Sequence, residues 1–194
     1  MKISTKFFND PKEYFKTCRD LPDGWIYLGD DEERYVLGQP GRQNVLTFGV
    51  NPSTAVPGRD DPTIRRVRKR VLDQGYDGWI MVNLYPLIAS KPKELPESCD
   101  RTLFRQNLRV IGAIQEAYPI AMAWAAWGDA IDLRPYLGEA LWEYHQLAEA
   151  DFEFYCCGTR TANGNPRHPL YLKGAEEFDW FAAYDYACSW SDLA

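Results

Sequence analysis

Short hydrophobic runs alternate with amphipathic segments along most of the chain. Four of the runs are continuously apolar, as expected for strands that are buried on both faces of a sheet. They cover residues 44–50, 78–85, 120–127 and 152–158. Three further segments place apolar residues three to four positions apart, which is the spacing of a helix face. They cover residues 61–75, 101–117 and 135–150.

This alternation predicts an α/β domain of three layers, α/β/α, with a mainly parallel central sheet. An antiparallel hairpin is predicted before it, because β-prone runs at 25–29 and 34–38 flank an acidic turn. An aromatic segment at the C-terminus is predicted to be helical. Since 194 residues fit a single domain, we expect one domain over residues 1–194, with a motif-bearing core at about 25–175.

The cysteine and histidine content argues against a disulfide framework and against a zinc site. The five cysteines form no C-x-x-C pair, and the chain has two histidines. We therefore expect no metal and no cofactor. No apolar run approaches the ~20 residues that a membrane-spanning helix needs. The sequence thus predicts a protein of the reducing cytoplasm with no membrane partner.

The formal net charge of −6 argues against a protein that coats nucleic acid non-specifically, because such binding depends on neutralising phosphates. One local basic face is nevertheless predicted on the helix at 61–75, within an arc of roughly 140° at ~100° per residue. It consists of Arg65, Arg66, Lys69 and Arg70. This face is a candidate phosphate-binding surface, and a charged, solvated helix face is the alternative interpretation.

All four buried strands end in or near polar loops. In an open parallel sheet the carboxyl ends of the strands meet at one edge, and ligands bind there. The loops contain Asn51-Pro52-Ser53, Asn83-Leu84-Tyr85-Pro86, Trp127-Gly128-Asp129 and Asn165-Pro166-Arg167-His168. The sequence therefore predicts a binding or catalytic site along this edge.

The first of these loops and the start of the next helix supply candidate catalytic groups. Asn51 and Ser53 offer an amide and a hydroxyl that can hold a water molecule, although Asn-Pro-Ser is also ordinary turn chemistry. Asp61 suits the N-cap of the helix, with Pro62 at the first position. Helix capping needs only Asp61 and gives no reason for the second aspartate, Asp60. Asp60 is therefore the candidate general base or, less readily, a magnesium ligand.

Two later residues are candidates for contact with a base. Asn83 is able to read the edge of a base through paired hydrogen bonds or, alternatively, to satisfy loop backbone. His168 lies beside Arg167 in a loop made rigid by flanking prolines, which favours a functional histidine. The other histidine, His145, falls on a predicted helix and is interpreted as a packing or surface residue.

Taken in order, the polar motifs resemble an uncharacterised bacterial and phage family that is known as a domain of unknown function. The motifs are Gly49-Val50-Asn51-Pro52-Ser53, Asp60-Asp61-Pro62-Thr63, Asn83-Leu84, Trp127-Gly128 and the segment 164–171. The same order is more distantly similar to the uracil-DNA glycosylase superfamily. The resemblance implies the α/β/α fold of that superfamily.

The resemblance to the glycosylases also implies roles for individual residues. Asn51, together with Asp60, would hold the attacking water. Asn83 would read the base, and His168 would stabilise the departing base anion. Ser53, Tyr85, Asn165 and Arg167 complete the predicted substrate contacts.

The sequence departs from the glycosylase pattern at Ser53, where that superfamily has glycine. It also departs in the loop that carries His168 (residues 164–171, the histidine loop), which is shorter than the corresponding glycosylase motif. Our first hypothesis is an enzyme that breaks the N-glycosidic bond of a damaged or modified base, in single-stranded DNA or in a free nucleotide. Two alternatives stay open. One is a non-catalytic module that binds a nucleotide or nucleic acid, and the other is a transferase that modifies bases.

Overall fold

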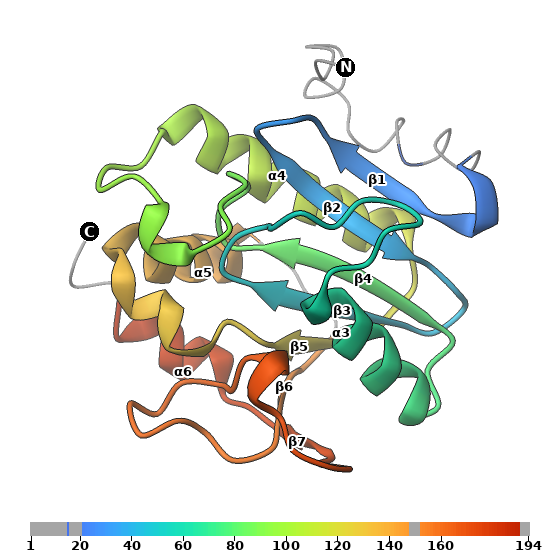
Figure 1. Ribbon diagram of the computed structural model, residues 1–194. Coiled ribbons are helices and arrows are strands. Elements are labelled where there is room, and N and C mark those ends of the chain that lie inside the picture. Colours follow the sequence, from blue (N-terminus) through green and yellow to red (C-terminus); the bar gives the residue numbers. More distant parts are fainter. Residues whose placement is uncertain (1–14, 16–20, 148–151, 191–194) are drawn as a thin grey trace.

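The computed structural model describes residues 15, 21–147 and 152–190 (Figure 1). Within them, seven strands form one sheet: β1 (Ile26–Gly29), β2 (Arg34–Gln39), β3 (Asn44–Gly49), β4 (Gly78–Asn83), β5 (Ile120–Ala125), β6 (Phe154–Cys157) and β7 (Phe178–Trp180). The described α-helices are α3 (Pro62–Asp73), α4 (Arg101–Ala117), α5 (Pro135–Leu147) and α6 (Ala183–Cys188). Short 3₁₀ segments lie at Pro22–Gly24, Pro92–Glu94, Gly128–Leu133 and Pro169–Tyr171.

The strand order is β1-β2-β4-β3-β5-β6-β7. The four central strands are parallel to one another, whereas β1, β2 and β7 pair antiparallel. Gly49 at the end of β3 lies opposite Asn83 at the end of β4, so the carboxyl ends of these strands meet. Because β2 runs antiparallel to β4, it begins at the same edge, where Arg34 donates its N–H to Pro86 (2.9 Å).

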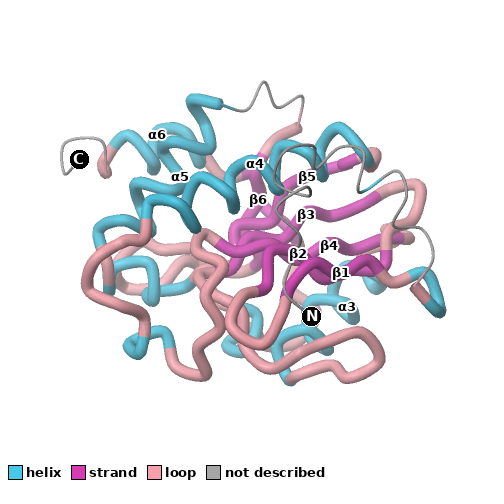
Figure 2. Tube along the Cα trace, turned by 90° about the horizontal axis from the view of Figure 1, so that it is seen from above, coloured by secondary structure: helices cyan, strands magenta, loops and turns pink. Residues whose placement is uncertain are grey.

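Helices cover both faces of this sheet (Figure 2). On one face α4, α5 and α6 pack against strand residues that include Phe48 and Val82. On the other face α3 packs through Ile64, Val67 and Val71, which lie three to four residues apart. These buried stripes hold the helices in place, since most helical stability in proteins comes from packing an apolar face.

The structure confirms the N-terminal hairpin and the alternation of strands and helices. It differs from the prediction at β7, a three-residue edge strand that is too short to produce a periodic sequence pattern. The sheet is mixed, because three of its six strand pairs are antiparallel. The predicted helix at 135–150 is described as far as Leu147, and positions 148–150 lie outside the described residues.

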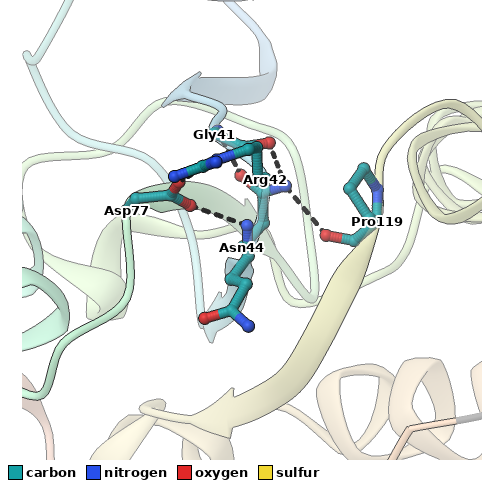
Figure 3. A network of polar contacts seen from close by, with 6 residues as sticks. Gly41, Arg42, Asn44, Asp77 and Pro119 are labelled. Atoms are coloured by element: carbon teal, nitrogen blue, oxygen red, sulfur yellow. Dashed lines mark hydrogen bonds and ion pairs between the residues drawn. The ribbon is translucent and has the colours of Figure 1, made fainter.

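At the amino edge of the parallel strands, polar side chains join the strand starts to neighbouring loops (Figure 3). The fully buried Asn44 accepts the N–H of Gly41 (2.7 Å) and donates to the carbonyl groups of Gly41 (3.0 Å) and Pro119 (2.8 Å). Asp77 pairs with Arg42 (3.3 Å) and accepts a backbone N–H (2.7 Å). This edge is therefore held by paired polar groups.

Candidate functional site

A cleft of about 1040 Å³ opens at the carboxyl edge of the parallel strands. It is bounded by the loop after β3, the first turn of α3, residues 89–93, the turn after β5 and the histidine loop. Its polar lining consists of Arg34, Asn51, Ser53, Thr54, Asp61, Thr63, Ser90, Lys91, Lys93, Asp129, Thr161, Arg167 and His168. This is the position at which open α/β sheets bind ligands, and the predicted edge is confirmed as the location of a cleft.

Asn51 lines the cleft directly after β3. Its Nδ2 donates to the carbonyl groups of Pro52 (2.9 Å) and Ala89 (2.8 Å), and the N–H of Ala89 donates back to Pro52 (3.0 Å). These bonds fix the orientation of the amide. Among the described residues no group donates to Oδ1 of Asn51, so this oxygen is available to accept a hydrogen bond from water or a ligand.

His168 starts the 3₁₀ segment Pro169–Tyr171 and lines the cleft. Its Nδ1 accepts the N–H of Leu170 (3.3 Å). Burial lowers the pKa of the imidazole to about 4, against an opposing effect of the Asp61 carboxylate. The ring is therefore neutral at pH 7, and because Nδ1 is an acceptor, the proton is on Nε2. His168 is a neutral hydrogen-bond donor.

Gly128, at the turn after β5, allows the close approach of the histidine loop. Its φ is +63°, a conformation that favours glycine. A Cβ atom at this position would lie 2.9 Å from the Cβ of His168. The N–H of Gly128 also donates to the carbonyl of Pro166 (3.0 Å). The position of the imidazole thus depends on the absence of a side chain at residue 128.

Two neighbouring aspartates start α3, and only Asp61 lines the cleft. Asp61 caps the helix as predicted, because its Oδ1 accepts the N–H of Ile64 (2.8 Å). Asp60, the predicted catalytic carboxylate, is not among the residues that line the cleft; it lies 3.8 Å from the guanidinium of Arg68 on α3. The carboxylate that faces the cleft is therefore the one that sequence reasoning treated only as a cap.

Arg34 is a cleft residue that sequence reasoning missed. Its side chain is buried, with 2% of the residue exposed, and Nη1 donates to the carbonyl of Ala55 (2.9 Å). Nε is buried and has no hydrogen-bonding partner among the described residues. Burial lowers the pKa of the guanidinium to about 10, and the Asp61 carboxylate opposes this shift, so Arg34 is charged at pH 7. An arginine at the start of a β-prone run carries no sequence signal of burial.

Asn83 lies beneath the cleft wall. Both polar atoms of its amide are buried and have no partner among the described residues. Gly49 and Met81 line the cleft above it. A Cβ atom on Gly49 would lie 2.8 Å from Oδ1 of Asn83 and 2.6 Å from Cε of Met81. An unpaired buried polar group lowers the stability of the fold by about 1–3 kcal/mol. A ligand that forms hydrogen bonds with the amide of Asn83 would offset this cost.

Two predicted substrate contacts lie away from the cleft. Tyr85 is buried in the core, and its hydroxyl accepts a backbone N–H (3.1 Å). The amide of Asn165 donates to Asp129 and Asp132, both at 2.9 Å. It also accepts the hydroxyl of Tyr186 (2.6 Å). Asn165 is thus satisfied within the protein and braces the histidine loop, so neither residue is placed to contact a ligand.

The basic face predicted on α3 is directed at a neighbouring loop. Arg66 and Arg70 donate to three backbone carbonyl groups of residues 172–176, at 2.6–3.1 Å. Lys69 forms an ion pair within the helix (2.7 Å), and Arg65 is exposed. None of the four lines the cleft. Their prediction as phosphate ligands is therefore not supported by their position.

The cleft has cations of its own, and they come from other segments. Four basic side chains and two carboxylates line it: Arg34, Lys91, Lys93 and Arg167, and Asp61 and Asp129. The guanidinium of Arg167 donates to loop oxygen atoms at 2.9–3.3 Å, so it is partly occupied. Tyr171 lies at the rim, 68% exposed, with its ring centroid 5.9 Å from that of His168. An exposed aromatic ring there offers a surface on which a planar group can stack.

Residues 15, 21–147 and 152–190 contain no group of three or more His, Cys, Asp or Glu side chains placed to hold a metal ion. Over the same ranges, no helix combines the length and the apolar character that crossing a membrane requires.

The sheet and its cleft define an α/β protein with a charged cleft at the carboxyl edge of its parallel strands. Residues 34–170 match the model of a family described as protein of unknown function (DUF1643). Because the match covers well over half of the sequence, the chain belongs to the DUF1643 family. No curated protein and no solved structure matches it.

Proposed function

We propose that this protein hydrolyses the N-glycosidic bond of a nucleobase, in a free nucleotide or in single-stranded DNA. The observation that carries the proposal is that a neutral histidine and a free asparagine oxygen line one cleft. Hydrolysis of a C–N bond needs a donor that stabilises the departing base and an acceptor that holds the attacking water. His168 and Asn51 have these two properties.

In the proposed reaction, a water molecule held by Oδ1 of Asn51 attacks C1′ of the sugar while the C1′–N bond breaks. The electron pair of that bond leaves with the base, and the Nε2–H of His168 stabilises the resulting negative charge. The water loses its proton to the Asp61 carboxylate, which passes it to solvent. The base takes up one proton from solvent. The products are a neutral base and a sugar with a hydroxyl group at C1′.

The unpaired amide of Asn83 supports a base as the ligand. Its donor and acceptor match the paired donor and acceptor atoms that bases present at their edges. Met81 lines the cleft, and its Cε lies next to Gly49, as does Oδ1 of Asn83; methionine is the most adaptable apolar side chain. A rotation of Met81 would expose the amide above the glycine at position 49. Tyr171 would then stack on the base from the rim.

We also propose that the fold is a three-layer α/β/α fold of the uracil-DNA glycosylase type. Helices pack on both faces of the parallel strands, and the cleft lies at their carboxyl edge. The motifs that resemble that superfamily occur in the same order along the chain. Asn51, Gly128 and His168 are among the residues of these motifs that line the cleft.

The test is mass spectrometry of nucleosides, nucleotides and single-stranded oligonucleotides, with normal and modified bases, after incubation with the protein. Release of free base together with an abasic sugar is the expected result. Binding without any product would replace the enzyme by a nucleotide-binding module. An added mass on the base would replace hydrolysis by group transfer.

Variants of the two named residues connect the activity to the cleft. Asn51→Ala and His168→Gln should each lower kcat/KM by about 10²–10³, the usual effect of removing one positioned polar group from a transition state. His145→Gln and Asn163→Ala are matched controls, because these side chains do not line the cleft. Full turnover by Asn51→Ala and His168→Gln, with both folded, contradicts the mechanism.

A further inference from the structure

We propose that Arg34 is the anion-binding residue of the cleft and that the substrate places a phosphate group against it. The choice of a nucleotide as the ligand rests on the proposed function. The anion site itself rests on the environment of Arg34. The substrate class is then a nucleotide or a phosphorylated strand, and a nucleoside without phosphate is a poor substrate.

The guanidinium of Arg34 is buried, and part of it has no partner among the described residues. Of its five donor hydrogens, those on Nη1 reach the carbonyl of Ala55 (2.9 Å), while Nε is buried without any partner among the described residues. No described carboxylate lies within 4.0 Å of the guanidinium. A buried charge is costly unless it is paired, and one hydrogen bond to a carbonyl does not offset that cost. An anion bound in the cleft would offset the cost of burying this charge.

The planar shape of the Arg34 guanidinium also suits a phosphate group. A guanidinium presents its donors as a planar fork that fits two oxygen atoms of a phosphate. Arg34 lines the cleft, and it is held at one end by Ala55 and at its backbone by Pro86. A side chain fixed in this way loses little freedom when an anion binds, which favours tight and specific binding.

The N-terminus of α3 opens into the same cleft as Arg34. Pro62, Thr63 and Ile64 line it, and α3 has twelve residues. The first turn of a helix carries partial positive charge, which attracts phosphate. Pro62 has no N–H and the N–H of Ile64 is bonded to Asp61 (2.8 Å), so of positions 62–64 only Thr63 offers its N–H to an anion. The Asp61 carboxylate is near enough to both Arg34 and His168 to affect the pKa of each. The start of α3, Arg34 and the catalytic histidine therefore surround one region.

The overall charge of the cleft points the same way. Its basic side chains outnumber its carboxylates by four to two, in a protein whose formal net charge is −6. Lys91 and Lys93 are exposed, line the same cleft as Arg34 and would steer an anion inward. The Asp61 carboxylate would oppose an anion, and one of its oxygen atoms is occupied by the N–H of Ile64. An anion is therefore attracted to the side of the cleft formed by Arg34.

The test is isothermal titration of the protein with the four deoxynucleosides, their 5′-monophosphates and inorganic phosphate, at constant ionic strength. For the base that binds, we expect the monophosphate to bind at least about tenfold more tightly than the nucleoside, as a charge-assisted hydrogen-bonded pair allows. Arg34→Met should remove that preference. Arg42→Met is the matched control, because Arg42 lies at the opposite edge with 95% of its side chain exposed, and it should keep the tenfold preference.

Arg34→Lys keeps the proposal testable if Arg34→Met does not fold. It preserves the charge but not the fork, so the preference for the monophosphate should fall to about threefold or less. A dinucleotide with one internal phosphate distinguishes a phosphorylated strand from a free nucleotide as the ligand. Tighter binding of the dinucleotide or of the monophosphate than of the nucleoside supports the proposal. Equal binding of nucleoside and monophosphate by the wild type, or an unchanged preference in a folded Arg34 variant, overturns it.

This result is independent of catalysis, because titration measures binding alone. A phosphate preference that depends on Arg34, without release of base, would leave the anion site in place and remove the proposed hydrolysis. Release of base at equal rates from nucleosides and nucleotides would support the proposed hydrolysis and remove the anion site.

Discussion

The two edges of the parallel strands carry similar residues that are used in opposite ways. At the amino edge, Asn44 is fully buried and makes three side-chain hydrogen bonds (Figure 3). At the carboxyl edge, Asn83 is equally buried, and neither atom of its amide has a partner among the described residues. The two arginines differ in the same sense. Arg42 is exposed and paired with a carboxylate, whereas Arg34 is buried and forms no ion pair within 4.0 Å among the described residues.

This contrast separates residues that stabilise the fold from residues that cost stability. A paired buried amide contributes to folding, while an unpaired one lowers the free energy of unfolding by about 1–3 kcal/mol per group. Such costs are typical of positions at which a ligand completes the hydrogen bonds. Variants at each edge test this contrast, and the stability changes that they should cause decrease from about 4 to about 1 kcal/mol.

The first prediction concerns the amino edge. Asn44→Leu should lower the free energy of unfolding by about 4 kcal/mol, because it removes three hydrogen bonds and leaves buried groups of the neighbouring loops unpaired. Urea denaturation measures the change. Asn163→Leu, in an exposed loop, should change it by less than about 0.5 kcal/mol. A loss below about 1 kcal/mol for Asn44→Leu would show that the paired network does not stabilise this edge.

The second prediction concerns the buried histidine of the cleft. The pKa of His168 is about 4 in the folded protein and 6.5 in an ordinary environment, so the unfolded chain takes up the proton first as the pH falls. The effect of His168 on the free energy of unfolding is therefore most favourable above about pH 6.5. This part of the stability is lost progressively as the pH falls to 4, where the loss reaches about 3 kcal/mol.

This loss is measured as the difference between the stabilities of the wild type and His168→Gln from pH 7 to pH 4. Subtraction removes the titration of carboxylates, which also occurs in this range. A difference that does not vary with pH would mean that the pKa of His168 is not lowered in the folded protein, and burial would no longer explain its neutral state.

The third prediction concerns the contact between the turn after β5 and the histidine loop. Gly128→Ala should lower the free energy of unfolding by about 2 kcal/mol, because it combines an unfavourable φ with a contact of 2.9 Å to His168. Gly164→Ala, at φ +83° with no atom within 4 Å, should cost only about 1 kcal/mol from the backbone. Equal losses of stability for the two variants in thermal denaturation would show that the histidine loop moves away from residue 128 at little energetic cost.

The fourth prediction reverses the sign of the first. Asn83→Leu should raise the free energy of unfolding by about 1 kcal/mol, because it replaces two unpaired buried polar atoms by apolar atoms of similar volume. Urea denaturation is again the measurement, and base release should fall in the same variant. A clear loss of stability would show that Asn83 has an internal role like that of Asn44.

Hydrophobic periodicity determined most of the fold. The spacing of Ile64, Val67 and Val71 predicts the buried face of α3, and the capping role of Asp61 follows from its position before a proline. The continuous apolar runs predict the four central strands, and their polar ends predict the edge at which the cleft lies. These are local properties, because a helix face repeats every three to four residues and a strand every two.

The tertiary structure alone decided which polar residues face the cleft. Arg34 is buried through a contact with Ala55, twenty-one residues away, and Arg66 is engaged by Leu172, 106 residues away. No local pattern encodes such pairs. Neighbours such as Asp60 and Asp61 likewise have the same chemistry, and only the backbone direction at the start of α3 separates them. The sequence by itself determined where polar groups gather, and packing between distant segments determined which of them remain unpaired for a ligand.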